Sequence, residues 1–128
     1  MTFLLDTRVF LWWVTDQPGV TDAAREAIAN PDNQVFLSAA SGWEIAIKSA
    51  LGRLDLPSVP AQFVPEQMQQ NSFDVLQVSM HHALEVHALP RHHGDPFDRM
   101  LIAQSRCEGL RLISGDHVLS AYDVEILW

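Results

Sequence analysis

The chain has 128 residues, 48% of them hydrophobic, and this size and composition predict one soluble globular domain spanning residues 1–128. Sixteen acidic residues oppose eight basic ones, and the net charge of −8 argues against the broad basic surface of many nucleic-acid binders. Cys107 is the single cysteine, which excludes an internal disulfide and suits a cytoplasmic location. No apolar run reaches the ~18 residues that a membrane span needs, and the N-terminus does not resemble a signal peptide.

Strand-like and helix-like runs alternate along the first half of the chain. Residues 3–5 predict a strand, and a short helix through residues 9–13 follows it. Thr21 or Asp22 can cap a second helix to about Ala29, and residues 34–37 predict a second strand after a turn. The clearest helix comes next, because apolar residues recur there at helical spacing. These residues are Trp43, Ala46, Ile47, Ala50, Leu51 and Leu54.

The second half of the chain continues the alternation. Pro57 and Pro60 end the periodic helix, and Pro96 and Gly109 suit the start and the end of a later one. The remaining helices are expected at about 61–70, 79–89 and 96–108, and the remaining strands at 73–78, 110–113 and 123–127. Five strands with helices between them predict an α/β domain of three layers, α/β/α, around a parallel sheet.

Four carboxylates are expected at one end of this sheet. Asp6 follows the first strand, and Asp116 follows the fourth. Glu44 lies in the first turn of the helix after the second strand, and Asp98 lies in the first turn of the helix that leads into the fourth strand. Because open parallel sheets bind ligands at the carboxyl ends of their strands, these acids can form one site.

Each acid also has a purely structural interpretation. Asp6 and Asp95 can cap the helices that follow them, and Asp116 can belong to a turn. Asp98 suits the positive end of a helix dipole. The segment 41–44, Ser-Gly-Trp-Glu, matches a capping box, and Glu44 can also pair with the lysine at i+4. Taken singly these interpretations are reasonable, so the functional one depends on the joint placement of the four acids.

Carboxylates gathered in one place repel one another and tend to protonate unless a cation neutralises them. Ligands that are all hard oxygens suit Mg²⁺ or Mn²⁺ rather than Zn²⁺. Such ions can activate water and stabilise the leaving oxygen in phosphodiester hydrolysis. The two His-His pairs, 81–82 and 92–93, lack the spacing of helical zinc ligands and are interpreted as surface residues.

At this point the sequence resembles a known family, the PIN-domain toxins of the VapC type. Residues 4–7, Leu-Leu-Asp-Thr, and the following Leu-Trp-Trp at 11–13 are similar to the family's opening. Residues 41–48 resemble the family's central acidic helix. The family's most specific stretch is resembled by residues 93–104, which read His-Gly-Asp-Pro-Phe-Asp-Arg-Met-Leu-Ile-Ala-Gln. The resemblance covers essentially the whole chain. Two departures are mild: Arg8 stands where many relatives carry His, and Ser114 replaces a common Thr.

The resemblance implies a PIN fold and an Mg²⁺- or Mn²⁺-dependent endoribonuclease that cleaves structured RNA, such as tRNA or rRNA, and arrests translation. Such a protein is the toxin of a type II toxin–antitoxin system. A VapB-type antitoxin would block the active site and carry the pair to operator DNA, and the toxin would form a homodimer. The family's catalytic, metal-binding acids correspond to Asp6, Glu44, Asp98 and Asp116, with Asp95 as a secondary candidate.

Contacts to an RNA phosphate need basic groups near these acids. Arg8, Lys48 and Arg99 are the candidates, and Arg91, His92 and His93 also lie nearby in sequence. A solvated surface is the competing interpretation for all of them. The tryptophans at 12, 13 and 43 are expected in the core or at a dimer interface rather than as platforms for RNA bases.

Three other functions are compatible with a small acidic α/β domain. A receiver-like Mg²⁺-binding signalling domain needs adjacent acids after the first strand and a late lysine, whereas Asp6 stands alone and no lysine follows Lys48. A catalytically inactive PIN-like module would only bind a partner protein, and the presence of all four acids weighs against it. A metal-dependent phosphatase of small molecules would differ in its substrate.

Overall fold

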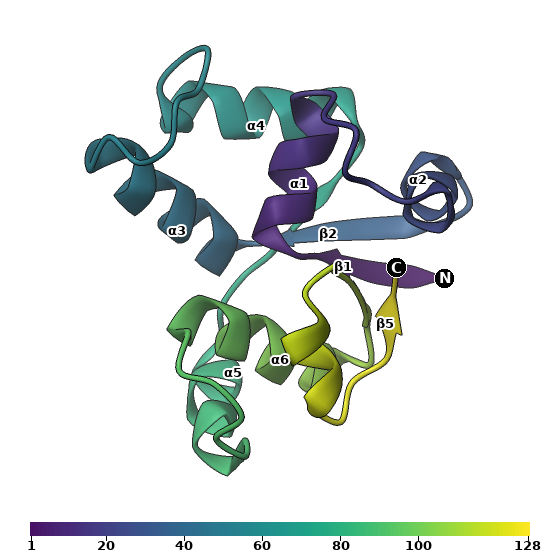
Figure 1. Cartoon of the computed structure of the whole chain (residues 1–128), viewed down its shortest axis with the longest axis vertical. Coiled ribbons are helices and arrows are strands. Elements are labelled where there is room, and N and C mark those ends of the chain that lie inside the picture. Colours follow the sequence, from purple (N-terminus) through teal and green to yellow (C-terminus); the bar gives the residue numbers. More distant parts are fainter.

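The computed structural model describes all residues, Met1–Trp128, and contains one five-stranded parallel sheet. The strand order β3-β2-β1-β4-β5 places the first strand at the centre (Figure 1). The strands are β1 (Thr2–Leu5), β2 (Gln34–Ser38), β3 (Asp74–Leu76), β4 (Arg111–Ile113) and β5 (Ile126–Leu127). The predicted parallel sheet is confirmed, although β5 begins later than expected. Its start is delayed because the Val124 N–H bonds to the Tyr122 carbonyl in a turn.

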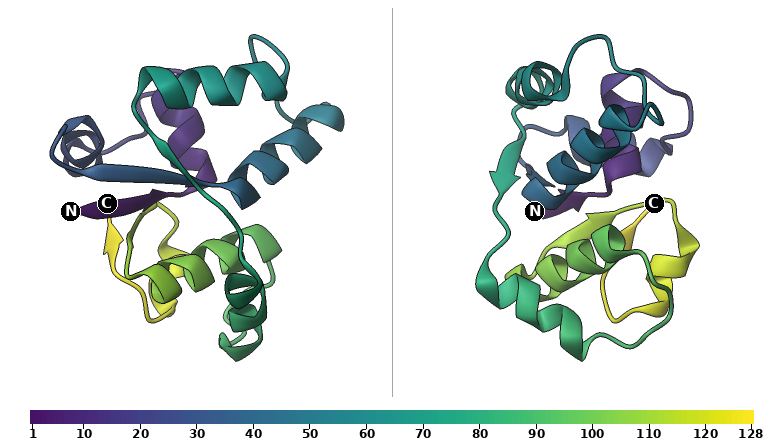
Figure 2. Two further views of the ribbon diagram at one scale, coloured as in Figure 1. Left: turned by 180° about the vertical axis from the view of Figure 1, so that it is seen from behind. Right: turned by 90° about the vertical axis from the view of Figure 1, so that its left-hand side faces the viewer.

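Helices cover both faces of the sheet, which confirms the three predicted layers. The α-helices are α1 (Thr7–Val14), α2 (Asp22–Ala29), α3 (Ala39–Ala50), α4 (Pro60–Gln70), α5 (Met80–Glu85) and α6 (Pro96–Glu108). Two 3₁₀ segments are η1 (Val86–Ala88) and η2 (His117–Ala121). The views of Figures 1 and 2 place α1 to α4 on one face, and α5, α6 and η2 on the other. No helix has the length and apolar character that crossing a membrane requires.

The central strand contributes to two separate hydrophobic cores. Phe3 and Leu5 pack in the core beneath α1 and α2, whereas Leu4 packs in the core beneath α6. Successive side chains of a strand point to opposite faces, so the apolar run of β1 serves both layers. Leu4 and Leu5 are completely buried. The residue that follows them is therefore held at a rigid position in the middle of the sheet.

Helix α3 begins earlier than expected and turns a different face inward. Its N-cap is Ser38, whose Oγ accepts the N–H of Ala40 at 3.0 Å, so the predicted capping box from Ser41 to Glu44 is wrong. The buried side chains of α3 are those of Ala40, Ser41, Glu44 and Ile45. Trp43, on the periodic apolar stripe, is 64% exposed. The stripe correctly predicted a helix, but periodicity cannot tell whether the domain itself covers an apolar face.

The carboxyl ends of β1 and β4 meet at the centre of the molecule. The two strands pair in parallel, and the N–H of Asp6 continues this pairing with a 2.9 Å hydrogen bond to the carbonyl of Ile113. After β1 the chain continues into α1 on one face of the sheet, whereas after β4 it continues into η2 on the other face. A crevice forms where neighbouring strands continue to opposite faces, and this is the usual ligand site of an open α/β sheet.

Candidate active site

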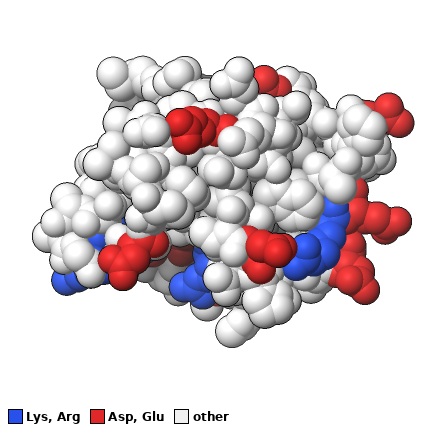
Figure 3. Space-filling model, turned by 90° about the horizontal axis from the view of Figure 1, so that it is seen from above, with Lys and Arg blue, Asp and Glu red and all other residues white.

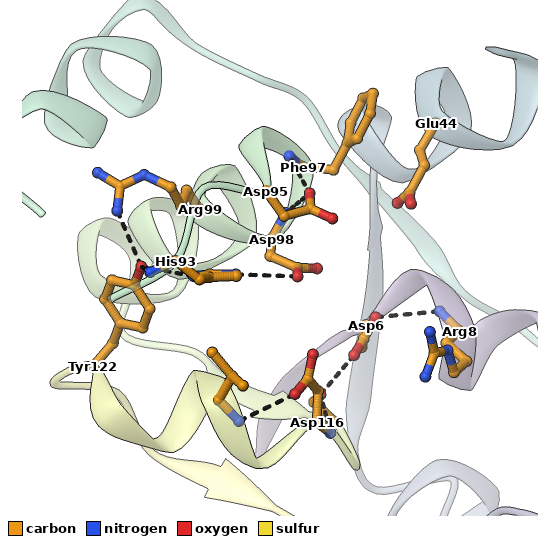
Figure 4. A network of polar contacts seen from close by, with 12 residues as sticks. Asp6, Arg8, Glu44, His93, Asp95, Phe97, Asp98, Arg99, Asp116 and Tyr122 are labelled. Atoms are coloured by element: carbon orange, nitrogen blue, oxygen red, sulfur yellow. Dashed lines mark hydrogen bonds and ion pairs between the residues drawn. The ribbon is translucent and has the colours of Figure 1, made fainter. Parts of the chain in front are cut away.

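A cleft of about 790 Å³ opens at this point and is lined by acidic side chains. The four predicted acids, Asp6, Glu44, Asp98 and Asp116, all line it, and so does Asp95. Figure 4 shows the five carboxylates around one open space, although they come from four separate segments of the chain. The structure therefore brings together the acids that sequence analysis selected.

Asp6 is both a helix cap and a buried acid of the cleft. Its Oδ1 accepts the N–H of Arg8 at 3.2 Å, which caps α1, and its Oδ2 accepts the hydroxyl of Ser114 at 2.5 Å. Only 7% of Asp6 is exposed. Burial raises the pKa of Asp6 above 3.8, against the opposing effect of the Ser114 hydrogen bond, and the negative charge of Glu44 raises it further.

Asp116 is held by the turn that follows β4. Its Oδ1 accepts the N–H of Val118 at 3.0 Å and caps η2, while its own N–H donates to the Ser114 hydroxyl at 3.1 Å. Ser114 thus links Asp6 to Asp116 across the two central strands. The role of Ser114 was not predicted, although its position directly after the strand beside β1 could have indicated one.

The close approach of Trp128 to this turn predicts that Gly115→Ala destabilises the protein. An added Cβ would lie 2.7 Å from two carbon atoms of the Trp128 indole, so the ring must move. Because Trp128 is 38% exposed and its indole can swing outward, we expect a loss of about 1–2 kcal/mol in the free energy of unfolding. Urea unfolding followed by tryptophan fluorescence measures the loss of stability, and the fluorescence of the folded state reports the displacement of the indole.

Gly94→Ala is the matched control for that substitution, because an added Cβ at Gly94 has no neighbour within 4 Å. We expect its unfolding curve to overlay that of the wild type. Equal stability of the two alanine variants would contradict the packing of Trp128 on the turn.

Two acids occupy the N-terminal end of α6. Asp95 is the N-cap, and its Oδ1 accepts the N–H groups of Phe97 and Asp98 at 2.9 and 3.1 Å. Asp98, in the first turn of the helix, accepts from His93 Nε2 at 3.2 Å through Oδ2. Burial raises the pKa of Asp98 to about 6, and the negative charge of Asp95 contributes to this shift. Asp98 and Asp95 are thus close enough to repel each other at the start of α6.

Glu44 faces the cleft from the second turn of α3, not the first turn that the sequence suggested. It is 6% exposed, and its Oε2 forms a 2.6 Å ion pair with Lys48 Nζ one turn later. The i,i+4 pair expected from the sequence is therefore present. Lys48 also lines the cleft and is half exposed, so it can turn toward a ligand when Glu44 is otherwise occupied.

The expected substrate contacts are only partly in place. Arg8 is exposed at the cleft beside the Trp12 ring. Arg99 was expected to contact substrate, but it is 7% exposed and does not line the cleft, because its guanidinium bonds to three main-chain carbonyls and to Tyr122. On the face seen in Figure 3, the few basic side chains lie beside acidic ones rather than in a continuous basic patch.

Two histidines differ from the expected surface role. His82 is 2% exposed and forms a capping box with Ser79 while its Nε2 contacts Glu108, so it stabilises the start of α5. His93 contacts Asp98 and Tyr122 and lies at the edge of the acidic cleft. The contact between His93 and Tyr122 could not be predicted from the sequence, because the two residues are 29 positions apart.

The residues of the cleft fit a divalent cation in their chemistry and charge. Their donors are carboxylate oxygens, which are the ligands that Mg²⁺ and Mn²⁺ prefer. Burial raises the pKa values of Asp6 and Asp98, with a smaller contribution from neighbouring carboxylates, and a cation in the cleft would favour the ionised forms. As the side chains stand, no three of them converge closely enough to hold an ion. Glu44 is held by Lys48 and Asp98 by His93, so binding would require small side-chain movements.

Comparisons with known proteins agree with this architecture. Residues 3–125 match the model of the PIN domain family. The chain is 30% identical over 122 residues to Ribonuclease VapC22 of Mycobacterium tuberculosis, which covers 94% of this chain and 92% of that protein. It is 40% identical over 58 residues to Ribonuclease VapC16 of the same organism, a match that spans 45% of this chain but only 41% of that relative.

Among solved structures, one similar fold is that of VapBC2 from Rickettsia felis bound to a DNA fragment from its promoter. Its TM-score is 0.74 at 10% identity, with 99% of this chain and 98% of that chain covered. At this identity the likeness concerns the fold alone, whereas the family match extends over nearly the whole sequence. The chain therefore belongs to the PIN-domain family and is of the VapC type.

Proposed function

We propose that this protein is the toxin of a type II toxin–antitoxin system, an Mg²⁺- or Mn²⁺-dependent endoribonuclease that cleaves structured RNA such as tRNA or rRNA in the cytoplasm. Translation arrest would follow from that cleavage. The observation that carries the proposal is the gathering of five carboxylates in one cleft at the centre of the sheet. The names of two relatives, Ribonuclease VapC22 and Ribonuclease VapC16, support the same activity.

Asp6, Glu44, Asp98 and Asp116 would hold the cation, and Asp95 has a second carboxylate oxygen free of its capping role. When bound, the ion would supply the positive charge that activates water and stabilises the leaving oxygen of a phosphodiester. The chain itself supplies rigidity. Helix caps and Ser114 fix Asp6 and Asp116, while Arg8 and Lys48 provide the charges that can bind a phosphate at the cleft.

The rival functions explain the cleft less well. A module that only binds a partner protein has no use for buried carboxylates that oppose one another's ionisation, since these lower its stability. A receiver-like domain needs a lysine that contacts its phosphorylated aspartate, but the lysine at this cleft, Lys48, pairs with Glu44. Failure to take up phosphate from acetyl phosphate would exclude the receiver-like domain, and inertness toward small phosphoesters would exclude the phosphatase.

A VapB-type antitoxin is the proposed partner, and operator DNA would be bound only through it. The Rickettsia felis structure of similar fold is a VapBC assembly bound to promoter DNA. In this chain the acidic cleft is suited to a basic segment of an antitoxin, because complementary charges favour association and register. Such a segment would occupy the cleft and exclude RNA from it.

We also propose a homodimer that forms through an apolar groove of about 530 Å³. The groove is bordered by Trp43 and Phe97, whose ring centroids lie 5.3 Å apart, and by Val78 and Met100. Trp43 is 64% exposed and Val78 is 39% exposed, a high exposure for side chains grouped around one groove. A second copy of the chain would cover them.

The dimer proposal predicts that Trp43→Ser shifts the protein to monomer at micromolar concentration. Leu51→Ser is the matched control, since Leu51, the C-cap residue of α3, is also exposed but does not border the groove. Light scattering after gel filtration measures the mass of each variant. A monomeric wild type, or a dimer that survives Trp43→Ser, would contradict this interface.

Induced expression in a bacterial host tests the proposed function. We expect the wild type to arrest growth and to produce discrete RNA fragments over time, and Asp6→Asn to do neither, because asparagine cannot supply the same charge to a cation. Arrest by both proteins would instead indicate toxicity through binding. Purified wild type that leaves total RNA intact in Mg²⁺ and in Mn²⁺ would count against the ribonuclease.

A further inference from the structure

A chain of polar contacts runs from a buried arginine to the acidic cleft. Arg99 Nη1 donates to the Tyr122 hydroxyl at 3.0 Å, and that hydroxyl lies 2.8 Å from His93 Nδ1. On the other side of the imidazole, His93 Nε2 lies 3.2 Å from Asp98 Oδ2. Figure 4 shows the four side chains in this order, with Asp98 between His93 and the other acids.

Arg99 is unusual because it is buried without a carboxylate partner. It forms no ion pair, and its guanidinium bonds to the carbonyls of Val86, Leu89 and Pro90 as well as to Tyr122. Removing an arginine from water is costly, so a buried cation held only by neutral oxygens calls for an explanation. The three carbonyls hold the guanidinium rigidly, and its charge makes the Tyr122 hydroxyl a stronger donor.

Donor counting assigns the proton positions along this chain. Arginine can only donate, so the Tyr122 oxygen accepts from Arg99, and it also accepts the backbone N–H of His93 at 3.3 Å. Both lone pairs of the hydroxyl are then used, and its one proton is directed to His93 Nδ1. His93 must therefore carry its own proton on Nε2, where it donates to Asp98.

The opposite tautomer would leave two conflicts. A proton on Nδ1 would be a third donor aimed at the Tyr122 oxygen, and the Tyr122 proton would lose its acceptor. The lone pair of Nε2 would then face the ionised carboxylate of Asp98, which can only accept. Both conflicts arise in a region that is largely removed from water, since Tyr122 is 4% exposed and the His93 side chain 19%.

We propose that Arg99, Tyr122 and His93 form a relay of fixed hydrogen bonds that positions Asp98. The relay holds Oδ2 of Asp98 against His93 and leaves Oδ1 for a divalent cation in the cleft. His93 is thus a positioning residue that acts through Asp98. This inference rests on the proposed function, and its measurements do not require RNA cleavage.

Mn²⁺ binding to the metal-free protein tests the positioning role. Loss of a side chain that orients a metal ligand typically weakens metal binding 10–100-fold, so we expect about a 10-fold or greater loss of Mn²⁺ affinity in His93→Ala. His93→Gln should retain most of the affinity, because its amide N–H can reach the position of Nε2. His92→Ala is the matched control: His92 packs edge-on against the same Tyr122 ring but forms no hydrogen bond to Asp98.

Nitrogen-15 NMR of the histidine rings at pH 7.5 tests the proton assignment. We expect His93 of the wild type to be an Nε2–H tautomer whose Nδ1 resonance is shifted by the hydrogen bond from the Tyr122 hydroxyl, and Tyr122→Phe, which removes only the hydroxyl, to lose that shift. An Nδ1–H tautomer in the wild type would overturn the relay. Equal Mn²⁺ affinity in wild type and His93→Ala would overturn the relay alone, whereas a wild type that binds no Mn²⁺ would overturn the cation site and the positioning role together.

Discussion

The Asp98→Asn protein is expected to cleave RNA at least about 100-fold more slowly than the wild type, because losing a direct ligand costs at least as much as losing a residue that orients one. Asparagine is nearly isosteric and can still accept the hydrogen bond from His93 Nε2. The change therefore removes charge from the cleft while leaving its shape intact. Initial rates on total RNA in Mg²⁺ and in Mn²⁺ measure the effect.

Asp32→Asn is the charge-matched control for this experiment. Asp32 is exposed in the turn before β2 and does not line the cleft, so its loss changes the net charge of the protein by the same amount. We expect it to cleave at the wild-type rate. An Asp98→Asn enzyme as fast as Asp32→Asn would remove Asp98 from the proposed site.

The same Asp98→Asn substitution is expected to stabilise the metal-free protein at neutral pH. The pKa of Asp98 is about 6 in the folded chain against an ordinary 3.8, so between these values the folded chain holds a proton that the unfolded chain has released. The stability that the protonated Asp98 contributes is thus fully present below about pH 4 and is lost as the pH rises through 6. Because water reaches part of the carboxylate, we expect a gain of about 1–2 kcal/mol at pH 7.5.

Urea unfolding at several pH values measures this contribution. The advantage of the Asp98→Asn protein over the wild type should grow between about pH 4 and pH 6 and stay constant above pH 6, while Asp32→Asn should follow the wild type throughout. Added Mg²⁺ should reverse the order by stabilising the wild type, since a ligand that binds only the folded state raises its stability by about 2.7 kcal/mol at 100 times its dissociation constant. A variant that is less stable than the wild type at pH 7.5 without metal would contradict the pKa shift.

Opposite effects of one substitution on activity and stability would distinguish a functional site from a structural one. If Asp98 served only the dipole of α6, its replacement would lower stability and leave cleavage unchanged. A carboxylate kept in a repulsive cluster for catalysis costs stability instead. The two Asp98→Asn measurements therefore separate the interpretations that the sequence left open.

The candidate acids could be predicted because strand ends are visible in the sequence. An apolar run followed by an acid, as at Leu5-Asp6, places that acid at the carboxyl end of a buried strand, and parallel strands bring such ends together. The structural and functional interpretations then proved compatible, since Asp6 and Asp116 each cap a helix and line the cleft. One carboxylate oxygen suffices for each cap; the second oxygen of Asp6 accepts the Ser114 hydroxyl, and that of Asp116 remains for the site.

Other features could not be predicted because they depend on side chains distant in sequence. Trp43 was expected in a core or an interface, and only the packing of α3 shows that its face lies outside the domain. Arg99 lies next to Asp98 in sequence, yet the two point to different sides of α6, and Arg99 contacts Tyr122 instead of substrate. Short-range sequence patterns contain no information about that partner.

The dependence of RNA cleavage on a divalent cation tests the central claim most directly. The purified protein, freed of metal by a chelator and of any antitoxin, would be incubated with total RNA before and after Mg²⁺ or Mn²⁺ is added in excess. The arrangement of Asp6, Glu44, Asp98 and Asp116 predicts intact RNA without metal and discrete fragments once either ion is restored. Cleavage that continues unchanged in the chelator would contradict a cation-dependent site.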